Sequence, residues 1–103
     1  MNFRELVTRS NDIKVKYRTK NLEDGHKEWT VSDYMSGFVK DVGDLSKLIM
    51  AQQNLRSFDG NLEDALKHEL GDCLWSLIII CEELGIDPKD ALNKTLTDLE
   101  ERL

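Results

Sequence analysis

Lys40-Asp-Val-Gly-Asp-Leu45 and His68-Glu-Leu-Gly-Asp-Cys73 are the two stretches around which the chain is organised. Both lie within apolar patterns of helical period, and each carries two carboxylates three residues apart: Asp41 and Asp44 in the first, Glu69 and Asp72 in the second. Residues i and i+3 share one face of a helix. Carboxylates at the edge of an apolar stripe are costly to bury without a cation. If the two helices face each other, four carboxylates converge, and their hard oxygen ligands favour Mg²⁺ or Mn²⁺.

One acidic pair of this spacing would mean little, because such pairs are common on solvated helix faces. The metal hypothesis depends on there being two pairs, each followed by an apolar helix. It also depends on Gly43 and Gly71, each of which precedes the second acid by one residue. Glycine in a helix interior costs about 1 kcal/mol relative to alanine. We therefore expect a close backbone approach at both glycines, which tight helix–helix packing would equally explain.

Length and composition predict one small cytoplasmic domain. The chain has 103 residues with 20 acidic against 14 basic side chains and a net charge of -6, which argues against nucleic-acid binding. We expect no signal peptide, and the longest apolar run, residues 77–81, is too short to span a bilayer. Cys73 and Cys81 are eight residues apart on one expected helix, too far for a mutual disulfide, and are interpreted as reduced core thiols.

Helical periodicity, a single proline and the lack of persistent strand-like alternation predict an all-α fold. We expect a small helical bundle of about four helices, over residues 2–18, 30–54, 61–84 and 88–103, with a loop at 19–30. The expected caps are Thr30 or Ser32, Asn61, Gly85 and Asp87-Pro88. Residues 73–81 are apolar nearly all round, which predicts burial on several sides and, in so small a domain, an oligomer interface.

Two tryptophans and two histidines need an interpretation beside the acidic pairs. Trp29 stands in a polar segment, where it is either a hydrophobic staple for the next helix or a stacking surface for a planar ligand. Trp75 lies in the apolar helix and is predicted to belong to the core, with stacking as the alternative. His26 and His68 have no metal-like spacing to each other, so we expect both to face solvent.

Residues 37–45, 68–75 and 83–87 together resemble the MazG-type nucleoside triphosphate pyrophosphohydrolases. Their signature is Glu-Glu-x-x-Glu, a spacer, and then Glu-x-x-Asp. The second motif matches in Glu69 and Asp72, and the spacer, residues 45–68, has 24 residues. The apolar helix that follows and ends in Glu-Leu-Gly-Ile-Asp is also characteristic of the family. The resemblance covers roughly residues 30–100.

The first motif departs from the family pattern. Asp41 and Asp44 stand where glutamates are usual, and Lys40 stands at the position of the first glutamate. Aspartate is shorter by one methylene, so closer helices, a water or a looser ion would have to compensate. Lys40 could contact a phosphate or partly replace the charge of the metal. Lys94 lies where family members tend to carry a phosphate-binding lysine, although Asp98 replaces the asparagine that usually follows it.

The resemblance implies a single MazG-like all-α domain over residues 1–103 that associates as a dimer or tetramer. It implies an enzyme that hydrolyses (deoxy)nucleoside triphosphates to monophosphate and pyrophosphate with Mg²⁺, or Mn²⁺, as a step in cleaning the nucleotide pool. The implied ligands and catalytic residues are Asp41, Asp44, Glu69 and Asp72. The implied substrate-binding residues are Lys94, Lys40 and Trp29.

Two alternatives remain open at this point. A degenerate member of the family could keep the bundle and act as a nucleotide-binding or oligomeric interaction module, which the departures at residues 40–44 favour and the intact Glu69 and Asp72 oppose. A pyrophosphohydrolase acting on another substrate, such as phosphoribosyl-ATP, ranks lower because no residue selects that substrate.

Overall fold

The computed structural model describes residues 1–103 as four α-helices without a strand, which confirms the predicted all-α class. The helices are α1 (Phe3–Glu23), α2 (Val31–Gln52), α3 (Leu62–Leu84) and α4 (Pro88–Arg102). No helix combines the length and the hydrophobicity that a bilayer crossing requires.

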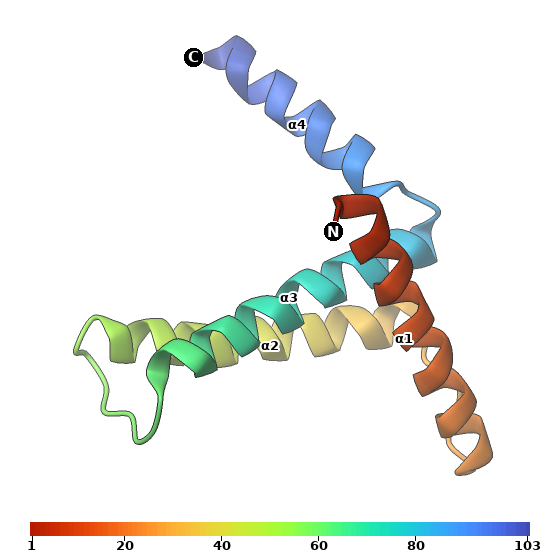
Figure 1. Ribbon diagram of the computed structural model, residues 1–103, viewed down its shortest axis with the longest axis horizontal. Coiled ribbons are helices and arrows are strands. Elements are labelled where there is room, and N and C mark those ends of the chain that lie inside the picture. The colour runs from red at the N-terminus through yellow and green to blue at the C-terminus, as the bar shows by residue number, and fades with distance from the viewer.

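The α2–α3 pair is the centre of the molecule. The two helices lie side by side and run in opposite directions, joined by residues 53–61 (Figure 1). All four buried residues of the chain belong to this pair, namely Ala51 on α2 and Cys73, Ser76 and Ile79 on α3. Burial of apolar surface between these helices therefore holds them in register, and their register positions the acidic residues.

Helix α1 crosses α3 and is fixed to it by polar as well as apolar contacts (Figure 1). The indole Nε1 of Trp75 donates a hydrogen bond to the carbonyl oxygen of Ser10 at 3.1 Å, and Lys14 Nζ lies 2.8 Å from Glu83 Oε1. The predicted loop at residues 19–30 is wrong in its first part, since α1 continues to Glu23. No helix breaker occurs before Gly25, whose φ of 79° ends the helical path.

The predicted caps are confirmed. Thr30 begins α2 with a capping box in which its side chain accepts from the Asp33 backbone N–H and Asp33 bonds back to Thr30. Asn61 caps α3, where its side chain accepts a hydrogen bond from the backbone N–H of Asp64 at 3.0 Å. Gly85 ends α3 in the left-handed conformation, and Asp87 with Pro88 starts α4.

Helix α4 projects away from the other three helices, so one copy of the chain is an open arrangement and not a closed four-helix bundle (Figure 1). The radius of gyration is 16.3 Å. A compact chain of this length would have about 13 Å. Within a single copy Leu74 and Leu77 are exposed while Ile79 is fully buried, so burial of residues 73–81 on several sides requires the predicted oligomer interface, which stays a prediction.

The predicted close approach at Gly43 and Gly71 is also wrong. A Cβ atom built at either position has no neighbouring atom within 4 Å. Both glycines lie on exposed parts of their helices, so neither helix contact nor a site requires them.

Candidate functional site

The antiparallel pairing of α2 and α3 brings together carboxylates that are far apart in the sequence. Oxygen atoms of Asp41 and Asp44 on α2 and of Glu69 on α3 lie within 4.8 Å of one another. We call these three residues the acidic cluster. Its members are half-buried, because the packing of the two helices shields one side of it. Three carboxylates at this spacing match the oxygen ligands that Mg²⁺ and Mn²⁺ prefer.

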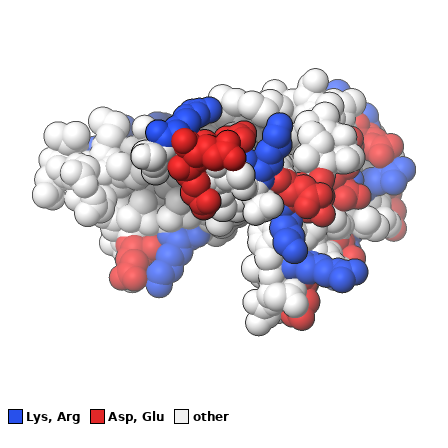
Figure 2. Space-filling model, turned by 90° about the horizontal axis from the view of Figure 1, so that it is seen from above, with Lys and Arg blue, Asp and Glu red and all other residues white.

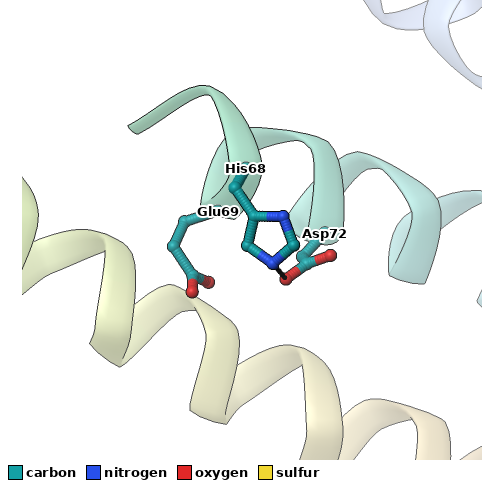
Figure 3. A group of neighbouring side chains, drawn as sticks. All are labelled: His68, Glu69 and Asp72. Atoms are coloured by element: carbon teal, nitrogen blue, oxygen red, sulfur yellow. Dashed lines mark ion pairs between the residues drawn. The ribbon is translucent and has the colours of Figure 1, made fainter. Parts of the chain in front are cut away.

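Asp72 lies beside this cluster and has a different nearest partner. Its Oδ2 is 3.2 Å from His68 Nε2, and the two residues form a second group with Glu69. Figure 3 shows Glu69 extending from α3 toward α2 while His68 turns to Asp72. The predicted four carboxylates are therefore arranged as two overlapping groups that share Glu69. His68 is exposed as expected, but its i, i+4 spacing to Asp72 was the overlooked signal for this pair.

Glu69 is the residue whose surroundings most clearly call for a cation. Its Oε2 is buried and has no hydrogen-bond partner. Burial raises the pKa of Glu69, and the charges of Asp72, Asp44 and Asp41 raise it further. A buried carboxylate oxygen without a donor is costly, and a divalent cation between the two helices would remove that cost. The residues present thus fit a bound metal ion.

Lys40 already supplies one positive charge to the cluster. Its Nζ lies 2.8 Å from Asp44 Oδ2, one helical turn away on α2. The hydrogen bond and the charge of each partner lower the pKa of Asp44 and raise that of Lys40. Lys40 therefore occupies an oxygen of a predicted metal ligand, which matches the interpretation that it partly replaces the charge of a metal.

Ser76 is a further residue at the site that the sequence analysis did not identify. This side chain is buried, and its hydroxyl donates to Asp41 Oδ2 at 3.4 Å. The contact orients the carboxylate of the shorter aspartate from the facing helix. Its signal was the position of Ser76, four residues after Asp72 within an otherwise apolar run.

An aromatic pocket adjoins the acidic cluster. It has a volume of about 320 Å³ and is lined by Tyr17, Asn21, Trp29, Tyr34 and Trp75. A neighbouring cavity of about 310 Å³ shares the last three of these aromatic rings and extends to Asp41 and Asp72. A planar ligand in the aromatic pocket would therefore have a continuous path to the carboxylates.

Both interpretations of Trp29 agree with this geometry. Its ring meets the ring of Tyr34 edge-on at 5.4 Å, in the N′ and N4 positions of a hydrophobic staple. The same ring lines the aromatic pocket and is 46% exposed, so its face is open to a ligand. Trp75 is half-buried and lines the pocket as well. The sequence analysis did not identify Tyr17 and Tyr34 as pocket residues, because they line one pocket only through the way in which α1 crosses α3.

Lys94 is placed apart from the other predicted site residues. It lies on α4, which projects away from the α2–α3 pair, and it lines neither the aromatic pocket nor the cavity beside the acidic cluster (Figure 1). The structure of one copy does not bring Lys94 to the carboxylates of that copy.

Comparison with known proteins adds one finding. The family model of the MazG nucleotide pyrophosphohydrolase domain matches residues 30–103, which include α2, α3, α4 and the whole acidic cluster. Neither a curated protein nor a solved structure matches the chain.

Proposed function

The chain belongs to the MazG nucleotide pyrophosphohydrolase family, and from that premise we propose that it is a metal-dependent hydrolase of (deoxy)nucleoside triphosphates. The products would be a nucleoside monophosphate and pyrophosphate, with removal of unwanted nucleotides as the cellular role. The single observation that carries the proposal is the buried and unpartnered Glu69 Oε2, held against Asp41 and Asp44. Because these oxygens lie close together across two helices, the residues of the family motif could hold one metal ion in this chain.

Asp41, Asp44 and Glu69 would hold the metal, and Asp72 would act from the adjoining group that His68 orients. Bound Mg²⁺ neutralises phosphate charge and lowers the pKa of water, which is the chemistry that an anionic phosphoanhydride requires. Ser76 keeps the Asp41 carboxylate directed across the helix pair. Lys40 lines the cavity beside the cluster, so its ammonium group is placed to contact a substrate phosphate when it leaves Asp44.

The nucleobase would bind in the aromatic pocket. Trp29, Tyr34 and Trp75 offer ring faces and edges there, and base–aromatic stacking contributes about 1–3 kcal/mol per base in single-stranded nucleic-acid complexes. Stacking tolerates every base, so the polar side chain of Asn21 at the rim is the group available for choosing among them. This places the base and the reacting phosphate at neighbouring parts of one groove.

Self-association as a dimer or tetramer would bury apolar side chains that one copy leaves exposed. Only four of 103 residues are buried in one copy, and the leucines of α4 have no partner within the chain. We propose that a second copy covers these leucines and that α4 carries Lys94 toward the acidic cluster of that copy. Lys94 would then contact substrate phosphate between subunits.

Pyrophosphate release tests the proposal directly. The purified protein would be incubated with a panel of nucleoside triphosphates and phosphoribosyl-ATP, with Mg²⁺ or Mn²⁺, and the products identified. We expect monophosphate and pyrophosphate, and we expect a chelator to abolish both. Free phosphate as the first product, or turnover that resists the chelator, would contradict the proposal.

The Lys40–Asp44 ion pair favours one second candidate, a nucleotide-binding or interaction module that does not turn over its ligand. Its lysine supplies the positive charge that a metal would otherwise bring. Any ligand that binds only the folded state raises the melting temperature. If this second candidate is correct, Mg²⁺ does not bind and should leave the melting temperature unchanged. No turnover together with no response to Mg²⁺ would favour this candidate over the hydrolase.

A further inference from the structure

A cavity on the other side of the acidic cluster differs in chemistry from the aromatic pocket. It has a volume of about 380 Å³, and Asp44 and Glu69 form its border with the cluster. Its remaining polar lining consists of Lys47, Arg56, Ser57 and His68. We call it the basic pocket. Figure 2 shows that basic and acidic side chains lie next to one another on the face of the molecule that it presents.

Two of these basic side chains have no carboxylate partner. The ion pairs of the molecule engage Lys14, Arg18, Lys27, Lys40, Lys67 and His68. Lys47 and Arg56 are in none of them and donate no side-chain hydrogen bond to another residue. Two free cationic groups that converge on one cavity are a receptor for an anion.

The positions of Lys47 and Arg56 in the chain place the basic pocket on the opposite side of the acidic cluster from the aromatic pocket. Lys47 follows Asp44 by three residues on α2, or about 4.5 Å along the helix axis. Arg56 comes from the loop after α2 and lines the basic pocket as well. Tyr34 precedes Asp41 by seven residues on the same helix, about 10 Å in the opposite direction. Aromatic rings, carboxylates and free cations therefore follow one another along the α2–α3 groove.

We propose that Lys47 and Arg56 bind the β- and γ-phosphates, and afterwards the leaving pyrophosphate, while the base lies in the aromatic pocket. This inference rests on the proposed function and assigns the polarity of the substrate in that site. It places the α-phosphate at the acidic cluster between the two pockets. Attack there by water on the α-phosphorus forms the new phosphorus–oxygen bond of the monophosphate, and the proton that the water loses passes through a neighbouring carboxylate to solvent. The bond from that phosphorus to the bridging oxygen breaks, and this oxygen leaves with its electron pair on the pyrophosphate. Lys47 and Arg56 offset the charge that the leaving group gains.

The opposite polarity fits the lining less well. Phe58 is the one phenylalanine, tyrosine or tryptophan ring of the basic pocket, whereas the aromatic pocket has four such rings. Lys40 is the one cationic side chain lining the cavities on that other side, and it is already paired with Asp44. A base against Phe58 would leave Lys47 and Arg56 without an anion and the triphosphate among aromatic rings.

Calorimetric titration of the full chain with inorganic pyrophosphate in the presence of Mg²⁺ tests the inference without requiring turnover. The double variant Lys47→Met/Arg56→Gln should bind pyrophosphate about tenfold more weakly, since it loses two charge-assisted contacts at an exposed site. The affinity of the double variant for a nucleoside monophosphate should equal that of the unaltered chain. The matched control Arg9→Gln/Lys67→Met makes the same change in net charge outside the pocket and should retain pyrophosphate affinity.

Three results would overturn the inference: unchanged pyrophosphate affinity in the Lys47/Arg56 variant, an equal loss in the control, or a loss that falls on the monophosphate instead. The melting temperature of each variant confirms that it is folded. The single variant Lys47→Arg keeps the positive charge and should therefore keep the pyrophosphate affinity of the unaltered chain. The failure of the proposed function is separate, because it would appear as absent pyrophosphate release from every nucleotide in the unaltered chain. Pyrophosphate binding that depends on Lys47 and Arg56 would still support the anion pocket in that case.

Discussion

The α2–α3 pair and α4 differ in what covers their apolar side chains. Every buried residue of the chain lies on α2 or α3, and Ile79 between them is fully enclosed. On α4, Leu92, Leu96 and Leu99 recur at helical spacing and remain 45–56% exposed. The leucine pattern is amphipathic in both places, yet only one of the two regions has a partner within the chain.

This difference shows that an amphipathic pattern specifies a buried face without specifying its partner. In the α2–α3 pair the partner is a neighbour in the sequence, joined by a short loop, so the acidic cluster forms within one copy. For α4 no segment of the same chain buries these leucines. The site and the proposed assembly therefore depend on different parts of the chain, and substitutions can separate them.

The largest effect is expected in the α2–α3 pair. Glu69→Gln with Asp72→Asn removes the charge shared by both acidic groups, and turnover should fall at least about a hundredfold, because metal catalysis contributes several kcal/mol. The fold should persist, as measured by circular dichroism. The control Asp90→Asn/Glu101→Gln makes the same charge change on α4 and should keep its activity. Equal losses in both variants would remove the distinction between the two regions.

The next effect concerns α4 alone. Leu96→Glu with Leu99→Glu should convert the proposed oligomer to monomers, at a cost of about tenfold or more in dissociation constant per leucine. Sedimentation velocity measures the mass, and the α2–α3 core should stay helical. Thr97→Glu, on another face of the same helix, is the control. A wild-type chain that sediments as a monomer would show that α4 is unpartnered in solution too.

A comparison of helix caps sharpens the contrast. Thr30→Ala removes the capping box of α2 and should lower the free energy of unfolding by about 1 kcal/mol. Asp87→Ala removes the cap of α4 and should leave the unfolding of the core unchanged under dilute, monomeric conditions. Urea denaturation at two protein concentrations measures both. Equal losses in dilute solution would mean that α4 unfolds together with the core.

Within the site, Lys40→Met should raise Mg²⁺ affinity by about a few fold, a small effect because the ion pair is exposed and solvent screens it. The lysine competes with a metal for Asp44, and the substitution removes that competitor. Titration of Mg²⁺ against melting temperature measures the change, with Lys67→Met as the control. Reduced Mg²⁺ affinity would mean that Lys40 orients the carboxylate.

The smallest effect is a pH dependence of the metal-free protein. The pKa of Glu69 is raised above the ordinary value of 4.5 in the folded chain, so the folded state binds that proton more tightly than the unfolded state. The resulting stability is present below pH 4.5 and is lost as pH rises through the raised pKa. Glu69→Gln should therefore be more stable than the unaltered chain at neutral pH, with the gain vanishing in acid. Thermal melts of both proteins from pH 4 to 7 without metal measure this difference in stability. A difference that grew toward low pH would contradict the prediction.

Much of the local structure could be predicted because it depends on near neighbours. Thr30, Asn61 and Gly85 mark helix ends by bonds within one turn, and Trp29 meets Tyr34 across one turn. The same reasoning failed where tertiary contacts decide. Gly43 and Gly71 were interpreted as close approaches, but the helices meet along other residues.

The acidic residues show the same division. Their i, i+3 spacing predicted that Asp41 shares a helix face with Asp44 and Glu69 with Asp72, since this periodicity is a property of the helix itself, and the structure brings oxygens of Asp41, Asp44 and Glu69 together. That Asp72 would pair with His68 could also be derived from spacing. That Ser76 would reach Asp41 could not, because it depends on the register of one helix against the other.

The amino-acid sequence by itself determined the helical class, the capped helix ends at Thr30, Asn61, Gly85 and Asp87, the family and the candidate carboxylates, because each depends on contacts within a few turns or on a motif. Only the tertiary structure decided that Glu69 would be shared between two groups, that an aromatic pocket and the basic pocket would flank it, and that α4 would remain uncovered. These features arise from the register and crossing of whole helices, which is set by the sum of many weak packing contacts and not by any one residue.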